Sequence, residues 1–188
     1  MTLIVGEELV TFCRNNVTPF DEGKVTGVTL DVTIACEIMM EKKPPNINTI
    51  HQPVDICSGD TPSMGRIYMR SGRFSYNNIT IHPGEFFLAR TQEVFTLPNN
   101  VTGEFSLCSS VARSGIGHSI SVLIKPGFSG SLTLELKNDT QYHPLVIRSG
   151  MTIGQIAFIK HDDVGEAFTY ARNGRYQGQE TVRQAVYG

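Results

Sequence analysis

Apolar and polar residues alternate along the segment that begins at residue 29. Leu30, Val32 and Ile34 are interleaved with Asp31 and Thr33, and the alternation continues to residue 38. A period of two predicts a strand with one face buried and the other in solvent. Residues 1–14 differ, because their apolar side chains share one rough helical face, which predicts a short helix.

Short strands are predicted along most of the remaining chain. Turn residues such as those at 83–84 and 126–127 separate them, and residues 42–65 are rich in turn formers and are predicted to be mostly loop. Many short strands at close spacing indicate a sandwich or a distorted β-barrel, so the predicted fold class is mainly β with short helices. The predicted strands cover residues 66–70, 78–82, 85–91, 103–107, 119–124, 131–137, 145–147 and 155–160.

Charge and composition limit the partners of the chain. Lys and Arg number 16 against 18 Asp and Glu, a net charge of −2, whereas a duplex-binding protein has a basic excess. No apolar run approaches the ~20 residues that span a bilayer, so neither nucleic acid nor membrane is predicted as a partner. The N-terminus lacks the pattern of a signal peptide, and the four cysteines lack metal-binding spacing. A cytoplasmic protein with free thiols is expected.

Glu135 is the first candidate for chemistry. It lies in the predicted strand LTLEL at residues 132–136, where the leucines face one way and Thr133, Glu135 and Lys137 face the other. A glutamate in such a position is either a solvated side chain or a general acid/base that faces a cleft.

The segment SSVAR at residues 109–113 follows a predicted strand and can open one helical turn. Two hydroxyl groups, free backbone N–H groups and Arg113 suit a phosphate or a polarised water, although a plain turn or helix cap has the same pattern. Further along, RYQGQ at residues 175–179 places an arginine, an aromatic ring and two amides in a polar C-terminal segment. That segment is either a disordered terminus or a lid that closes over a ligand.

Histidine spacing argues against a metal held by the protein. None of the five histidines forms an HxH, HxxxH or HxE pattern, and the H-x-E and P-C-x-x-C signature of zinc deaminases is absent. Walker and GxGxxG phosphate loops are absent from the sequence as well.

Several segments, taken in order, resemble the dCTP deaminase family of the dCTP deaminase and dUTP pyrophosphatase superfamily. Asp31 resembles the aspartate of an early S-x-D-x-R strand, and residues 81–91 resemble the hPGef-lA-T strand of that family. Residues 109–116 resemble its S-S-x-A-R-x-G-l segment, and residues 126–136 its P-G-W-x-G-x-l-t-L-E segment. Residues 150–155 and the tail at 170–179 match too, so the resemblance runs from about residue 29 to 180.

This resemblance implies a homotrimer of distorted β-barrels of the dUTPase-like, β-clip type, with an active site at each subunit interface. It implies deamination of dCTP to dUTP and ammonia without a protein-bound zinc. Mg²⁺ would bind together with the triphosphate. Residues 1–168 would form the barrel domain, and residues 169–188 a tail that closes over the nucleotide.

The resemblance also assigns roles to individual residues. Glu135 would be the proton shuttle, Ser109 would help to hold the attacking water, and Arg113 would orient the site. The hairpin at residues 115–125 would read the pyrimidine base. The residues expected to bind the nucleotide and its phosphates are Ser110, His118, Val122, Gln155, Tyr170, Arg175, Tyr176 and Gln179.

The chain departs from the family pattern at four places. Cys108 replaces an arginine before Ser109, Leu123 replaces an arginine near the base, and Lys125 replaces an acidic residue before Pro126-Gly127. The loop at residues 113–118 is about one residue shorter. Three functions therefore stay open: a metal-free dCTP deaminase, a dUTP or dCTP pyrophosphatase acting alone or in addition to deamination, and a regulatory protein that binds nucleotides without turnover.

Overall fold

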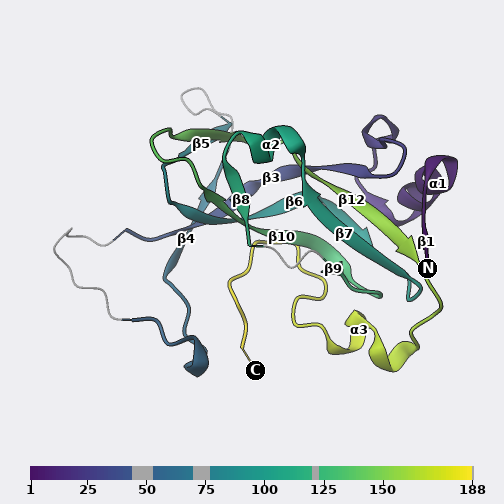
Figure 1. The fold of residues 1–188 in the computed structure, drawn as a ribbon. Coiled ribbons are helices and arrows are strands. Elements are labelled where there is room, and N and C mark those ends of the chain that lie inside the picture. The colour runs from purple at the N-terminus through teal and green to yellow at the C-terminus, as the bar shows by residue number, and fades with distance from the viewer. Residues whose placement is uncertain (44–52, 70–76, 120–122, 188) are drawn as a thin grey trace.

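The computed structural model describes residues 1–43, 53–69, 77–119 and 123–187 of the chain (Figure 1). Strands dominate, and the helices among these residues are short: α1 (Gly6–Asn16), α2 (Ser109–Arg113) and α3 (Tyr170–Asn173), with single 3₁₀ turns at Glu22–Lys24, Ile56–Ser58 and Glu166–Phe168. The predicted N-terminal helix and the helical turn at residues 109–113 are confirmed. The strands are β1 (Thr2–Leu3), β2 (Val17–Thr18), β3 (Leu30–Glu41), β4 (Met64–Tyr68), β5 (Asn78–Ile81), β6 (Phe86–Thr96), β7 (Val101–Leu107), β8 (Ile116–His118), β9 (Leu123–Ile124), β10 (Ser129–Asn138), β11 (Leu145–Arg148) and β12 (Thr152–Lys160).

One curled antiparallel sheet organises the molecule. Its main path is β8-β10-β6-β3-β12-β7-β9, with β1, β2 and β4 added at β12, β6 and β3, while β5 and β11 pair separately. The mainly β class predicted from the sequence is confirmed. Residues 119–124 were predicted as one strand. In the structure Ser119 lies outside any strand and Leu123–Ile124 form β9, while residues 120–122 lie outside the described part of the chain.

Strand β3 differs from the half-exposed strand that its alternation predicted. Thr33 and Glu37, expected on the solvent face, are only 3% exposed. Buried polar groups need partners, and both have them. Glu93 of β6 accepts hydrogen bonds from the backbone N (2.9 Å) and Oγ1 (2.8 Å) of Thr33, and Lys24 Nζ lies 3.0 Å from the same carboxylate. The polar face of β3 is therefore a second, hydrogen-bonded interior layer.

The C-terminal segment runs back along β10 below the sheet, as the yellow end of the ribbon in Figure 1 shows. Gln179 forms a parallel bridge with Gly130 of β10, and its side chain is 3% exposed. Gly130 has a φ of 134°, and a Cβ there would lie 2.9 Å from both the N and O atoms of Gln179. Glycine is thus required at this contact. Val182 is fully buried, so the segment that reads as a flexible tail by composition packs as part of the fold.

Candidate active site

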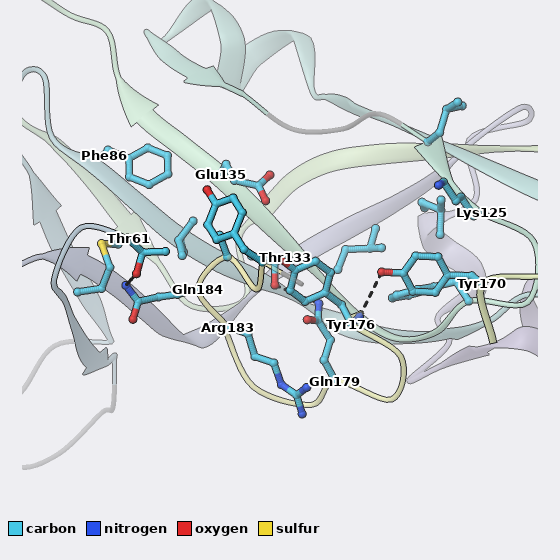
Figure 2. Close-up of a pocket in the computed structure, with 18 of the residues that line it drawn as sticks. Thr61, Phe86, Lys125, Thr133, Glu135, Tyr170, Tyr176, Gln179, Arg183 and Gln184 are labelled. Carbon is cyan, nitrogen blue, oxygen red and sulfur yellow. Dashed lines mark hydrogen bonds between the residues drawn. The ribbon is translucent and has the colours of Figure 1, made fainter. Parts of the chain in front are cut away.

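A cavity of about 490 Å³ opens beside β10, between the sheet and the C-terminal segment (Figure 2). Strand β10 provides Thr133 and Glu135, and its partner β6 provides Phe86 and Leu88. Leu132 of β10 and Met64 at the start of β4 also line it. The remaining described lining residues come from the loop before β4, from β9 and the turn after it, and from the C-terminal region: Thr61, Pro62, Leu123, Ile124, Lys125, Phe128, Tyr170, Tyr176, Gln179, Arg183, Gln184, Ala185 and Tyr187.

The strand ladder explains why Glu135 faces this cavity. Leu134 and Leu136 are fully buried in the core, so the intervening Glu135 points to the other face of β10, as the alternation predicted. Leu88 of β6 lies directly opposite Glu135 in the register. A bulge between Ser131 and Thr133 breaks the alternation, which is why Leu132 joins Thr133 and Glu135 at the cavity wall.

The Glu135 carboxyl group is in an unusual environment. Burial raises its pKa above the ordinary value for glutamate, and a hydrogen bond from its own backbone amide offsets part of that rise. Its Oε2 atom is buried and has no hydrogen-bond partner among the described residues. A partly desolvated carboxyl group that faces a cavity, with one oxygen lacking a hydrogen-bond partner, can act as a proton acceptor and donor. A fully solvated glutamate, which was the other interpretation of the sequence, would not have a buried Oε2 atom.

Aromatic and amide side chains stand around Glu135. Figure 2 shows Glu135, Thr133 and Tyr176 near the middle of the cavity, with Tyr170 and Lys125 to one side and Thr61 and Gln184 to the other. The Tyr170 hydroxyl accepts a hydrogen bond from the Tyr176 backbone N at 3.3 Å. The side-chain Nε2 of Gln179 donates to Ser131 O at 2.7 Å and to Thr133 Oγ1 at 3.0 Å. These contacts fix the C-terminal segment against the strand that carries Glu135.

The structure brings only some of the sequence-predicted residues together. Glu135, Tyr170, Tyr176 and Gln179 line the cavity. Arg175 does not; its Nη1 donates to Val186 O at 3.0 Å. His118 also lies outside the lining, with its ring 6.2 Å from that of Phe105, and Val122 lies outside the described residues.

A second group of predicted residues gathers elsewhere. In Figure 1, α2, which carries Ser109, Ser110 and Arg113, lies on the upper side of the strands, away from the C-terminal segment. Gln155 of β12 pairs in register with Asp31 of β3 and accepts a hydrogen bond from Thr29 Oγ1 at 3.3 Å. The Asp31 charge helps to raise the pKa of Cys108, although burial is the larger cause. None of these residues lines the cavity of the same chain.

Sequence reasoning missed several lining residues. Thr61, Pro62 and Met64 come from the loop-rich segment, which has no periodic pattern to single them out. Arg183, Gln184 and Tyr187 follow the last recognised motif residue in a polar segment. Phe86 and Leu88 lie inside the hPGef-lA motif, which was the one available signal; in the structure they pair with Lys137 and Glu135 of β10.

The described residues contain no group of three or more His, Cys, Asp or Glu side chains that could hold a metal ion. Within the same part of the chain, no helix is long and apolar enough to cross a membrane.

Comparisons with known proteins agree with the geometry. The family model described as dCTP deaminase-like matches residues 7–161. The protein named dCTP deaminase, dUMP-forming, of Mycobacterium ulcerans is 32% identical over 172 residues, which cover 88% of this chain and 84% of the relative. The protein of the same name from Mycobacterium tuberculosis (strain H37Rv) is 33% identical over 171 residues, with the same coverage.

A solved structure shows the same fold. The 2′-deoxycytidine 5′-triphosphate deaminase of Agrobacterium tumefaciens superposes with a TM-score of 0.61 at 17% identity. The match covers 83% of this chain but only 47% of that chain, so the present chain spans about half the length of this structural relative.

Proposed function

The chain belongs to the dCTP deaminase-like family, and we propose that it deaminates dCTP with Glu135 as the group that moves protons. The observation that carries this proposal is the Glu135 carboxyl group itself. It faces a cavity, burial raises its pKa, and Oε2 lacks a partner among the described residues. A carboxyl group of this kind is suited to a reaction that needs several proton transfers in sequence.

Deamination of cytosine needs several proton transfers in sequence. Water must lose a proton as it adds to C4 of the ring, N3 must gain a proton, and the amino group must be protonated before it leaves as ammonia. One carboxylate can take the first proton from water and give it to N3, and then take the second proton from the new C4 hydroxyl and give it to the amino group, which leaves as ammonia while the C4 carbonyl forms. Burial raises the pKa of the Glu135 carboxyl group, which makes its protonated form easier to reach during the reaction. The aromatic and apolar wall formed by Phe86, Leu88 and Phe128 suits the flat base.

The two separated groups of motif residues support a site shared between copies of the chain. Glu135, Tyr170, Tyr176 and Gln179 line the cavity, while Ser109, Ser110, Arg113 and Gln155 do not. We propose that α2 of a second copy brings the serines and Arg113 to the open side of the cavity in a homotrimer. Arg113 would then orient the site, as the resemblance implies. The tail at residues 169–188 would close the site.

Mg²⁺ fits this site as an ion that binds together with the triphosphate of the substrate. Mg²⁺ in nucleotide sites keeps several waters and binds through one or two carboxylates and the phosphates. Among the described lining residues Glu135 is the only carboxylate, so the chain offers no cage for the ion. We propose that Mg²⁺ arrives bound to the triphosphate, where it neutralises charge. The protein would contribute N–H, hydroxyl and guanidinium donors.

The nucleotide product is either dUTP or dUMP. Relatives are named dUMP-forming, which favours removal of pyrophosphate in addition to deamination. In the chain itself, Lys125 lines the cavity at the place where the resemblance expects an acidic residue. A lysine ammonium cannot act as the base that activates water for phosphate cleavage at neutral pH. We therefore propose dUTP as the main product and dUMP as the second candidate.

One experiment separates these functions. Purified protein is incubated with dCTP and Mg²⁺, and the products are resolved by chromatography with parallel assays of ammonia and pyrophosphate. Ammonia with dUTP supports deamination alone, whereas ammonia with equimolar pyrophosphate and dUMP supports the coupled reaction. Pyrophosphate without ammonia would make the protein a pyrophosphatase. Binding of dCTP without either product would leave a regulatory protein and refute the proposal.

A further inference from the structure

The C-terminal segment is fastened at a second point beyond Gln179. Val182 is fully buried in a small apolar cluster with Met39 and Leu88, and Met64 and Phe86 pack against it. The carbonyl oxygen of Val182 accepts a hydrogen bond from Arg66 Nη2 at 3.1 Å. Arg66 stands on β4, opposite Met39 of β3. Arg66 thus binds the backbone of Val182, and the apolar cluster buries its side chain.

A buried carboxylate orients Arg66. Glu37 of β3 has a side chain only 3% exposed, and its Oε1 accepts a hydrogen bond from Arg66 Nη1. Its other oxygen, Oε2, lies 3.4 Å from Arg90 Nε. A carboxylate buried to this extent is costly unless cations and donors surround it, which accounts for the two arginines. The planar guanidinium of Arg66 then presents its second nitrogen to Val182.

The fastened segment forms one wall of the cavity. Gln179 precedes Val182, and Arg183, Gln184 and Tyr187 follow it, and all four line the cavity. Gln184 Nε2 adds a hydrogen bond to Pro62 O at 2.7 Å on the loop across the cavity. Glu37, Arg66 and Val182 themselves are not lining residues. Their contacts can therefore change how firmly the wall closes without changing the groups that meet a ligand.

We propose that Arg66, oriented by Glu37, is a positioning residue that fastens the C-terminal segment over the cavity by binding the carbonyl group of Val182. Release of this bond frees the wall that carries Arg183, Gln184 and Tyr187. The fastening therefore sets the affinity for the nucleotide, while Glu135 keeps its chemistry. This inference rests on the proposed function only for the identity of the nucleotide.

Two variants test whether the Arg66 hydrogen bond and the buried Val182 side chain hold the C-terminal segment in place. Arg66→Met removes the donor, and Arg90 remains beside Glu37 to limit the cost to folding. Val182→Ala keeps the ion pair and removes apolar contact, so it remains informative if the arginine variant folds poorly. Arg148→Met and Val146→Ala on β11 are matched controls, because both side chains are exposed and lie outside the cavity.

Hydrogen exchange of the full-length protein without nucleotide gives the first readout. Amides of residues 178–186 should exchange roughly tenfold faster in both variants than in the wild type, because Arg66→Met loses a hydrogen bond from a charged group and Val182→Ala loses buried apolar contact. The controls should match the wild type. Unchanged exchange in both folded variants would overturn the proposal, and this result does not depend on any enzymatic activity.

Kinetics with dCTP give the second readout. The KM should rise about tenfold in both variants, while kcat changes less and its pH dependence stays that of the wild type, because Glu135 is untouched. Faster exchange with an unchanged KM would refute the link between fastening and binding. A wild type without turnover would refute the proposed function instead, and dCTP affinity measured by calorimetry would then take the place of KM.

Discussion

Gln179 donates a hydrogen bond from its side-chain amide to the hydroxyl of Thr133, over a distance of 3.0 Å. Thr133 lies two residues before Glu135, on the same face of β10. The last part of the chain is therefore bonded directly to the strand that carries the proposed proton shuttle. This hydrogen bond gives a coupling between the C-terminal segment and the strand, and it involves no atom of the Glu135 carboxyl group.

This coupling leads to a prediction about the tail. Protease cleavage after residue 165 should slow when dCTP and Mg²⁺ are added, because phosphate oxygens in the cavity would give new partners to donors of the C-terminal segment that line it, such as Arg183. Gel analysis of timed digests measures it, with Mg²⁺ alone as the control. Identical cleavage with and without nucleotide would show that the tail does not close over a ligand.

Glu135→Gln should abolish most of the turnover. The change keeps the shape of the side chain but removes the proton acceptor, so ammonia release from dCTP should fall by about 10²-fold or more. Folding, oligomeric state and nucleotide affinity should persist. Glu7→Gln on the exposed face of α1 is the control and should retain full activity. Full activity in the Glu135 variant would remove the centre of the mechanism.

The same substitution should change how stability depends on pH. Burial raises the folded-state pKa of Glu135, so its stabilising contribution is complete below the ordinary glutamate pKa and is lost as pH rises through the folded value. The free energy of unfolding of Glu135→Gln, minus that of the wild type, should therefore become more positive between pH 4 and pH 8.

Urea unfolding at several pH values, at one fixed protein concentration, measures this difference. Other titrating groups cancel between the two proteins. A difference that stays flat or falls with pH would mean that the Glu135 carboxyl group is well solvated in solution.

Mixed oligomers should recover activity that two variants lack separately. Glu135→Gln and Arg113→Ala remove groups that the structure places on separate parts of one chain. If neighbouring copies supply them to one shared site, co-refolded mixtures contain some sites with both groups intact. Activity in the mixture above either variant alone, with a trimer mass by light scattering, is the expected result. A strictly monomeric protein, or a mixture with no recovery, would refute the shared site.

Local patterns predicted the features that depend on neighbouring residues in the sequence. Alternation placed Glu135 opposite to Leu134 and Leu136, and the structure confirms that arrangement. It failed for Thr33 and Glu37, because burial of the polar face of β3 depends on Glu93, Arg66 and Arg90, which lie far away in the sequence. Pairing over such separations leaves no periodic trace.

The C-terminal segment shows the same limit more sharply. Its composition is polar, and its two isolated valines give no pattern, yet Val182 is fully buried. The motif residues were recognised by resemblance, but their distribution over two sides of the chain could not be deduced from their order. Only the fold separates Arg113 on α2 from Glu135 on β10.

The burial of Val182 has a practical consequence for labelling the protein. A dye or spin label attached at this position would have to enter the interior beside Met39 and Leu88, so it would displace the segment that it was meant to report on. Val186 is exposed and lies outside the cavity lining, so a label there would follow the same segment with less disturbance.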